Sequence, residues 1–181
     1  MKQLATIVCI LGVFLAVSGV SYGDDGFVFV ANLSGEQEVV GPNGELLPPP
    51  QPGIETDTTG QVRLSFDRAL TRARFRLRVN NGEDITQAHL HCAPAGVNGP
   101  IAVFLFPFTD PAVDVNGLLS EGELTNDSFV ASAAGCPATC GKPVNNIASL
   151  RAAILDGCIY ANVHSGTFPG GVIRGQVRPA E

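Results

Sequence analysis

Histidines occur at two places in the chain, and their spacing predicts a metal site. His89 and His91 are separated by one residue, while His164 lies much further along, and these three are all the histidines of the sequence. In a β-strand, residues two apart point to the same face of the sheet, so the first pair would lie side by side. If the strand of His164 is a neighbour, three imidazoles meet and could hold one copper or zinc ion. If the strands lie apart, each histidine forms only local hydrogen bonds.

The strand of His164 belongs to a predicted hairpin near the end of the chain. Two β-rich runs flank a glycine-rich turn: 158–165 and 172–178 around 166–171. A turn centred near Phe168 places Tyr160, Asn162 and Arg174 on the same face as His164, with Asn162 opposite Arg174. These three side chains are therefore the candidates to surround the metal ligands, although an arginine beside a cation lowers the affinity for it.

Four cysteines outside the N-terminal region predict two disulfide bonds: Cys92, Cys136, Cys140 and Cys158. Cys136 and Cys140 flank a short loop, which favours a local bridge between them. Cys92 and Cys158 each lie beside a histidine strand, which favours a second bridge that joins these strands. The other ways to pair the four cysteines stay open, as does metal binding by the C-x3-C pair.

The N-terminal region is typical of a secretory signal peptide. Lys2 precedes an apolar run over 4–17 that is too short to cross a bilayer comfortably, and small residues predict cleavage after Gly23, so that 1–23 is the signal. Cleavage would leave 24–181 as a single secreted or periplasmic domain without a transmembrane segment; an uncleaved membrane anchor is the alternative. The chain has a formal net charge of −6, no tryptophan and no basic tract, which argues against nucleic-acid binding.

Frequent glycine and proline, together with short periodic runs, predict an all-β domain. The predicted strands, besides the terminal hairpin, are 27–33, 61–66, 69–79, 85–92, 101–106 and 118–125. One short helix is predicted over 147–155, with Asn146 as its N-cap and Gly157 as its stop. The proline-rich segment 41–53 is expected to form an extended loop, or else a recognition arm. These elements predict an antiparallel Ig-like or Greek-key sandwich of roughly seven to nine strands.

Two of the predicted strands offer surfaces to a partner. Arg72, Arg74, Arg76 and Arg78 alternate with apolar residues, so the four arginines share one face of the sheet. This face is expected to be solvated and paired with acidic side chains on adjacent strands; an anionic partner such as a sulfated glycan is the alternative. The run 101–106 is apolar on both faces, as in a covered strand or a partner-binding edge.

Three segments resemble the CHRD domain, a family named for its occurrence in chordin and common in exported bacterial proteins: LSGEQEV (33–39), AHLHCAPAGVNGPIAVFL (88–105) and YANVHSGTFPGGVIRGQV (160–177). The resemblance runs from about Phe27 to Arg178 and implies an exported module, since chordin-type proteins antagonise secreted growth factors. The partner would be an extracellular or periplasmic protein or glycan. The chain departs from the family in having Val172 where a glutamate is usual, a longer proline-rich segment, and the loop between Cys136 and Cys140.

A weaker likeness is to copper–zinc superoxide dismutase, a Greek-key sandwich with an H-x-H strand and further histidines on neighbouring strands. His89 and His91 would match its H-x-H pair, but no histidine is left for a bridging ligand or a separate zinc site. The chain also lacks G-x-S-x-G, H-E-x-x-H and a phosphate-binding loop. The first hypothesis is therefore a binding module rather than an enzyme. A mononuclear copper redox enzyme and a purely structural envelope or matrix module are the alternatives.

Overall fold

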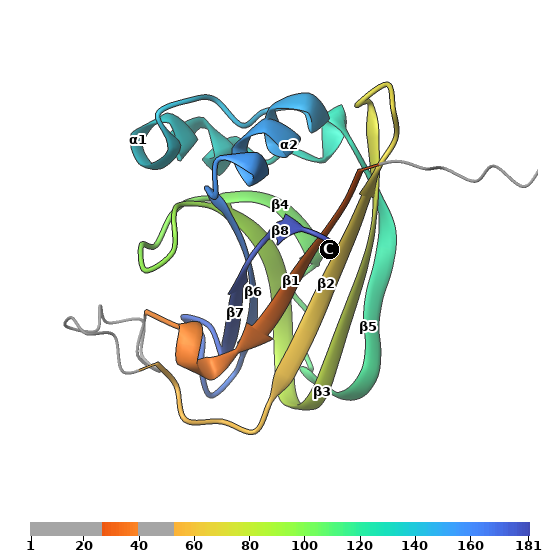
Figure 1. The fold of residues 1–181 in the computed structure, drawn as a ribbon. Helices are drawn as coiled ribbons and strands as arrows, with labels where there is room; N and C mark the ends of the chain where they lie inside the picture. Colours follow the sequence, from red (N-terminus) through yellow and green to blue (C-terminus); the bar gives the residue numbers. More distant parts are fainter. Residues whose placement is uncertain (1–26, 40–52) are drawn as a thin grey trace, which may run out of the picture.

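Eight β-strands form one antiparallel sheet in the computed structural model, which describes residues 27–39 and 53–181 (Figure 1). The strands are β1 (Phe27–Ser34), β2 (Thr59–Phe66), β3 (Arg72–Cys92), β4 (Ile101–Phe106), β5 (Val113–Thr125), β6 (Ile159–Ser165), β7 (Ile173–Gln176) and β8 (Arg178–Pro179). The helices are α1 (Cys136–Cys140) and α2 (Ile147–Leu155), with short 3-10 helices at Gly35–Gln37, Asn126–Ser128 and Ala131–Gly135. The predicted signal segment 1–23 and all but the last residue of the proline-rich segment 41–53 lie outside the described residues.

The sheet closes on itself, so the predicted all-β antiparallel class is confirmed but the sandwich is wrong. Neighbouring strands follow the order β2-β1-β7-β6-β3, and β3 also pairs with β2, which completes a closed barrel of five strands. The terminal hairpin has the predicted register, because Asn162 lies opposite Arg174 and Tyr160 opposite Gln176. A closed barrel leaves no free edge between these five strands.

The long strand β3 makes this closure possible. Its first half pairs with β2 and β5, and its second half pairs with β6 and β4. The sequence predicts two strands here, 69–79 and 85–92, but the chain between them stays in the sheet. Asn81 and Asp84 have positive φ angles of 51° and 55°, and the pairing with β5 shifts register around them. Such bulges bend a strand and increase its twist, which carries β3 from one side of the barrel to the other.

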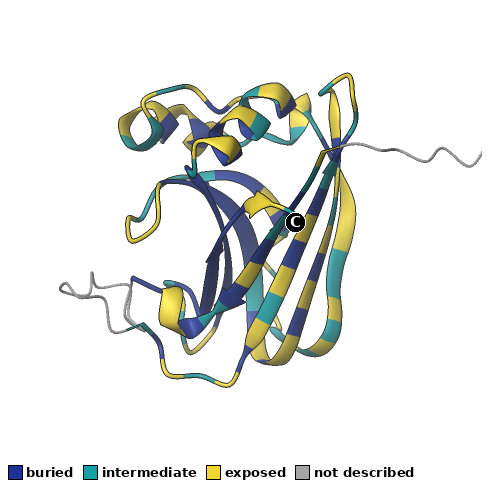
Figure 2. Ribbon diagram, viewed as in Figure 1, coloured by how far each residue is buried: buried dark blue, intermediate teal, exposed yellow. Residues whose placement is uncertain are grey.

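The apolar core fills the barrel, and buried and exposed residues alternate along several of its strands (Figure 2). The helices cover one end of the barrel (Figure 1). The predicted helix α2 is confirmed, with the Asn146 side chain accepting from the Ser149 backbone and Gly157 in a left-handed conformation after its end. Four of its residues join the core cluster: Ile147, Leu150, Ala153 and Ile154. The second helix, α1, is not predicted by the sequence pattern. Among the described residues, no helix is long and apolar enough to span a bilayer.

The arginine face is solvated, as expected. The side chains of Arg72, Arg74 and Arg76 lie exposed and form ion pairs with acids of the adjacent strand β5, at Glu121 and Glu123. The shortest of these, from Arg76 Nε to a Glu121 carboxylate oxygen, is 2.9 Å long. Neighbouring carboxylates therefore already compensate much of the positive charge on this face.

The favoured disulfide pairing is wrong. Cys92 is bonded to Cys136, and Cys140 is bonded to Cys158. The physical reason is that Cys136 and Cys140 are the two ends of helix α1, which lies over the ends of both histidine strands. Each end of the helix therefore reaches a different strand, β3 at one end and the start of β6 at the other.

Loss of either disulfide is expected to destabilise the fold, and the first bridge should matter more. Replacing Cys92 and Cys136 by serine should lower the free energy of unfolding by about 4 kcal/mol, and replacing Cys140 and Cys158 by about 3 kcal/mol. The reason is the larger sequence separation of the first pair, 44 residues against 18. Urea unfolding of the oxidised variants measures both losses. A larger loss for the second pair would contradict this account.

Candidate metal centre

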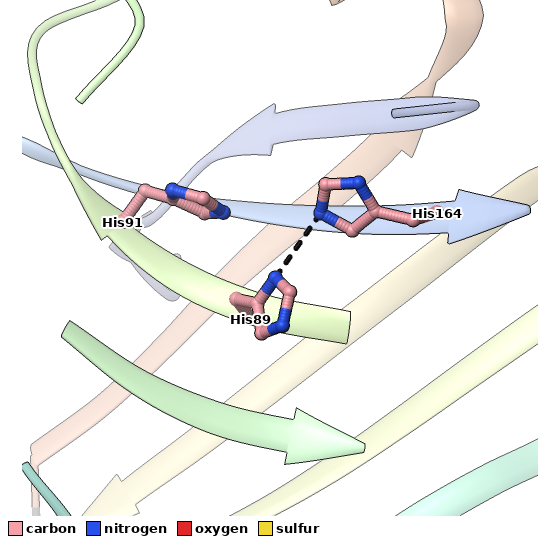
Figure 3. Close-up of side chains that lie close together, drawn as sticks. All are labelled: His89, His91 and His164. Atoms are coloured by element: carbon pink, nitrogen blue, oxygen red, sulfur yellow. Dashed lines mark hydrogen bonds between the residues drawn. The ribbon is translucent and has the colours of Figure 1, made fainter. Parts of the chain in front are cut away.

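The three histidines lie together on two paired strands (Figure 3). Within the pairing of β3 with β6, Gln87 faces His164 and His89 faces Asn162, so His164 lies diagonally across from His89. One ligand nitrogen from each ring lies within 4.8 Å of the others. Adjacent residues of these strands point into the apolar core, so the imidazoles occupy the opposite face of the barrel wall. The condition on which the predicted site depends, that the two histidine strands are neighbours, is therefore met.

Backbone carbonyl groups fix the proton positions on two of the rings. His91 Nδ1 lies 3.0 Å from the carbonyl oxygen of Gly99, and His164 Nδ1 lies 3.0 Å from that of Pro169. A carbonyl oxygen only accepts, so both Nδ1 atoms carry the proton and both Nε2 atoms are unprotonated. His89 Nδ1 is 3.1 Å from His164 Nε2 and must therefore be the donor of that hydrogen bond.

Two ring nitrogens in this cluster are buried without any hydrogen-bond partner, Nε2 of His89 and Nε2 of His91. Buried polar atoms are almost always paired, because an unpaired one costs roughly 1–3 kcal/mol. Both atoms are lone-pair acceptors in the tautomers given above. The cluster therefore contains lone pairs that no protein group uses, on atoms that bulk water does not reach.

Burial keeps all three imidazoles neutral. The side chains are almost inaccessible, with exposed fractions of 1% for His89 and 7% for both His91 and His164. Burial lowers the pKa of His89 to about 3, helped by repulsion from the other two rings. Burial also lowers the pKa of His91 to about 4 and lowers that of His164. Neutral imidazole is the form that binds metal ions, so no proton needs to leave these rings near neutral pH.

Aromatic rings form the walls of the cluster. The ring of Tyr160 stacks on His91, with a centroid distance of 4.8 Å and an angle of 6° between planes. Phe104 of strand β4 packs edge-to-face against His89 at 4.5 Å. The guanidinium of Arg174 lies 3.5 Å above the other face of Tyr160. A stack of His91, Tyr160 and Arg174 thus runs outward from the cluster.

The other predicted neighbours lie close to the cluster but bind elsewhere. The Asn162 amide donates to a carboxyl oxygen of Glu38 at 2.5 Å and to the Ile173 carbonyl at 3.2 Å. The Arg174 guanidinium donates to oxygens of the loop that follows β3: Asn98 Oδ1, Pro94 O and Val97 O. This loop also contains Gly99, the partner of His91. Arg174 therefore holds the loop that orients one histidine.

Glu38 is the residue that sequence reasoning missed. It is 1% exposed, and burial raises its pKa to about 8, against the opposing effects of Arg174 and the Asn162 hydrogen bond. The only signal for it was its place in the segment 33–39, which resembles the CHRD domain. Glu38 is far from Asn162 along the chain, so the sequence gives no hint that this glutamate lies beside the terminal hairpin, which contains His164.

Residues 29–177 match the family model of the CHRD domain, which includes both histidine strands and the loops that orient them. The chain belongs to the CHRD domain family. No curated protein and no solved structure matches it. The histidine cluster is therefore the feature of this chain that bears on its function.

Proposed function

We propose that this CHRD protein is an exported binding module that holds one copper or zinc ion through His89, His91 and His164. The observation that carries the proposal is the convergence of three buried, neutral imidazoles, two of which have their lone pairs aimed by backbone carbonyls. Such a second layer of hydrogen bonds commonly orients the histidine ligands of metal ions. A cluster serving only the fold would be expected to pair its buried nitrogens, yet Nε2 of His91, the ligand atom of that ring, has no hydrogen-bond partner.

One pair of nitrogens, from His89 and His164, already has a spacing close to that of a bound ion, whereas the set of three is known to lie within 4.8 Å and would close in around it. Two imidazoles bound to one metal ion at about 2.0–2.1 Å have their nitrogens roughly 3.3–3.6 Å apart. His89 Nδ1 and His164 Nε2 are 3.1 Å apart, so the two nitrogens have to move apart by only a few tenths of an ångström to bind an ion between them. The proton of His89 Nδ1 would then move to its Nε2, which leaves the ring neutral.

Burial of the cluster favours a binding module over the alternative of a copper redox enzyme. A catalytic metal needs a position open to its substrate. Here all three ligands are at most 7% exposed, and Phe104 and Tyr160 pack against two of them. A module that carries or stores a metal ion needs no such opening. Two disulfides are compatible with an oxidising compartment, which supports export.

Metal titration of the oxidised protein tests this proposal. The parent chain is expected to bind one equivalent of copper, and the variant His89→Ala/His164→Ala is expected to bind none at micromolar concentration. Gln87→Ala is the matched control, because Gln87 pairs with His164 in the sheet but is not among the three ligands. Urea unfolding verifies that the variants are folded. If the parent binds neither copper nor zinc, the proposal is wrong.

A further inference from the structure

We propose that the three-histidine site selects copper(I) over copper(II) and zinc(II). This inference rests on the proposed function and goes further, because it names the oxidation state of the ion. Two independent features of the structure support it: the number of available ligands, and a buried positive charge close to the site.

The ligand set is complete at three. Within the described residues, the metal-binding group consists of the three histidines, and no cysteine or carboxylate joins them. Zinc(II) takes four ligands and copper(II) four or more, and water supplies a missing one where solvent can enter. The tight burial of the rings and the packing of Phe104 and Tyr160 disfavour a bound water here. Copper(I) is stable with three imidazoles and no water, so it matches the ligands present.

A buried arginine opposes charge on the ion. Arg174 is 2% exposed, and its hydrogen bonds go to neutral oxygens of Pro94, Val97 and Asn98. No carboxylate forms an ion pair with it in the described parts of the chain. Its guanidinium lies against Tyr160, and Tyr160 lies against His91, so the positive charge is separated from a ligand by a single ring.

Repulsion from this charge grows in proportion to the charge on the ion, and it is stronger in a buried site than in water. A divalent ion bound by three neutral histidines brings twice the charge of copper(I). The nearest buried acid, Glu38, hydrogen-bonds to Asn162 rather than to Arg174. Because burial raises the pKa of Glu38 to about 8, it is mainly uncharged at neutral pH and does not cancel the arginine.

Competition titrations on the parent protein test the selectivity directly. Metal-free, oxidised protein is titrated with copper(I) without oxygen against the chelator bicinchoninate, and with zinc(II) and copper(II) against chelators of known affinity. We expect one equivalent of copper(I), bound about a hundredfold or more tighter than zinc(II). If zinc(II) or copper(II) binds as tightly as copper(I), the selectivity is wrong but the metal-binding function stands. If no ion binds, both proposals are wrong.

A charge variant tests the role of the arginine. Arg174→Met is expected to raise the affinity for zinc(II) relative to copper(I) by about tenfold or more. Arg178→Gln is the matched control, since it removes the same charge from an exposed residue four positions along and should leave the ratio unchanged. The ratio distinguishes an effect of the charge from a loss of structure. If the variant disordered the loop that Arg174 holds, the affinities for all the ions would fall together and their ratio would stay the same. Should Arg174→Met not fold, Arg174→Lys provides the test: it keeps the charge, so an altered ratio in it would contradict the proposal.

Discussion

Acidification from about pH 7.5 to pH 4 is expected to lower the free energy of unfolding of the metal-free Glu38→Gln variant by about 6 kcal/mol through His89 and His91. The folded protein holds the pKa of these histidines at about 3 and about 4, whereas an unfolded chain has the ordinary value near 6.5. Between these values the unfolded state binds more protons than the folded state. The stabilisation is therefore complete above about pH 6.5 and is lost progressively as the pH falls towards the folded values.

Urea unfolding at closely spaced pH values measures this effect. The slope of stability against pH counts the protons taken up on unfolding. Between about pH 5 and 6.5, where ordinary carboxylates stay ionised, two to three histidines give a slope of about 3 kcal/mol per pH unit. The measurement uses the Glu38→Gln variant because ionisation of Glu38 lowers the stability as the pH rises, whereas the histidines raise it. A flat profile over this interval would show that the imidazoles are hydrated, which would also weaken the case for a dry metal site.

The candidate metal site was predicted from the sequence because it depends on local rules. Alternation along a strand places His89 and His91 on one face, whatever the rest of the chain does. The register of the terminal hairpin follows from its turn, so the side chains next to His164 could be identified as well. Only the adjacency of the two strands was an assumption, and the pairing of β3 with β6 confirms it.

The features that the sequence did not predict depend on contacts between distant segments. Bulges at Asn81 and Asp84 join the two predicted strands into the single long strand β3. Because β3 pairs with both β2 and β6, the sheet closes into a barrel instead of forming the two sheets of a sandwich. Helix α1 separates two cysteines that look like partners along the chain, because it lies across two strands. Turn and helix signals in the sequence are too short in range to show where a bend or a short helix will dock.

Glu38 is the clearest example of such a long-range contact, and its substitution has a large expected effect. We expect Glu38→Gln to be more stable than the parent by about 4 kcal/mol at about pH 9, with little difference at about pH 4. Glutamine keeps an oxygen to accept the hydrogen bond from Asn162, while it removes the group that ionises. The benefit of the substitution therefore appears only where the parent's carboxyl group has to carry a charge.

The sign follows from the raised pKa. Folding holds the pKa of Glu38 at about 8, well above its usual value near 4.5, so the parent binds an extra proton in the folded state between these values. Its contribution is complete below about pH 4.5 and is lost as the pH rises through 8. Glu36→Gln is the matched control, because this neighbour is exposed and should give parallel profiles for parent and variant. If Glu38→Gln also runs parallel to the parent, Glu38 is ionised throughout. The charge of Arg174 would then be partly cancelled, and the metal site would lose one reason to prefer copper(I).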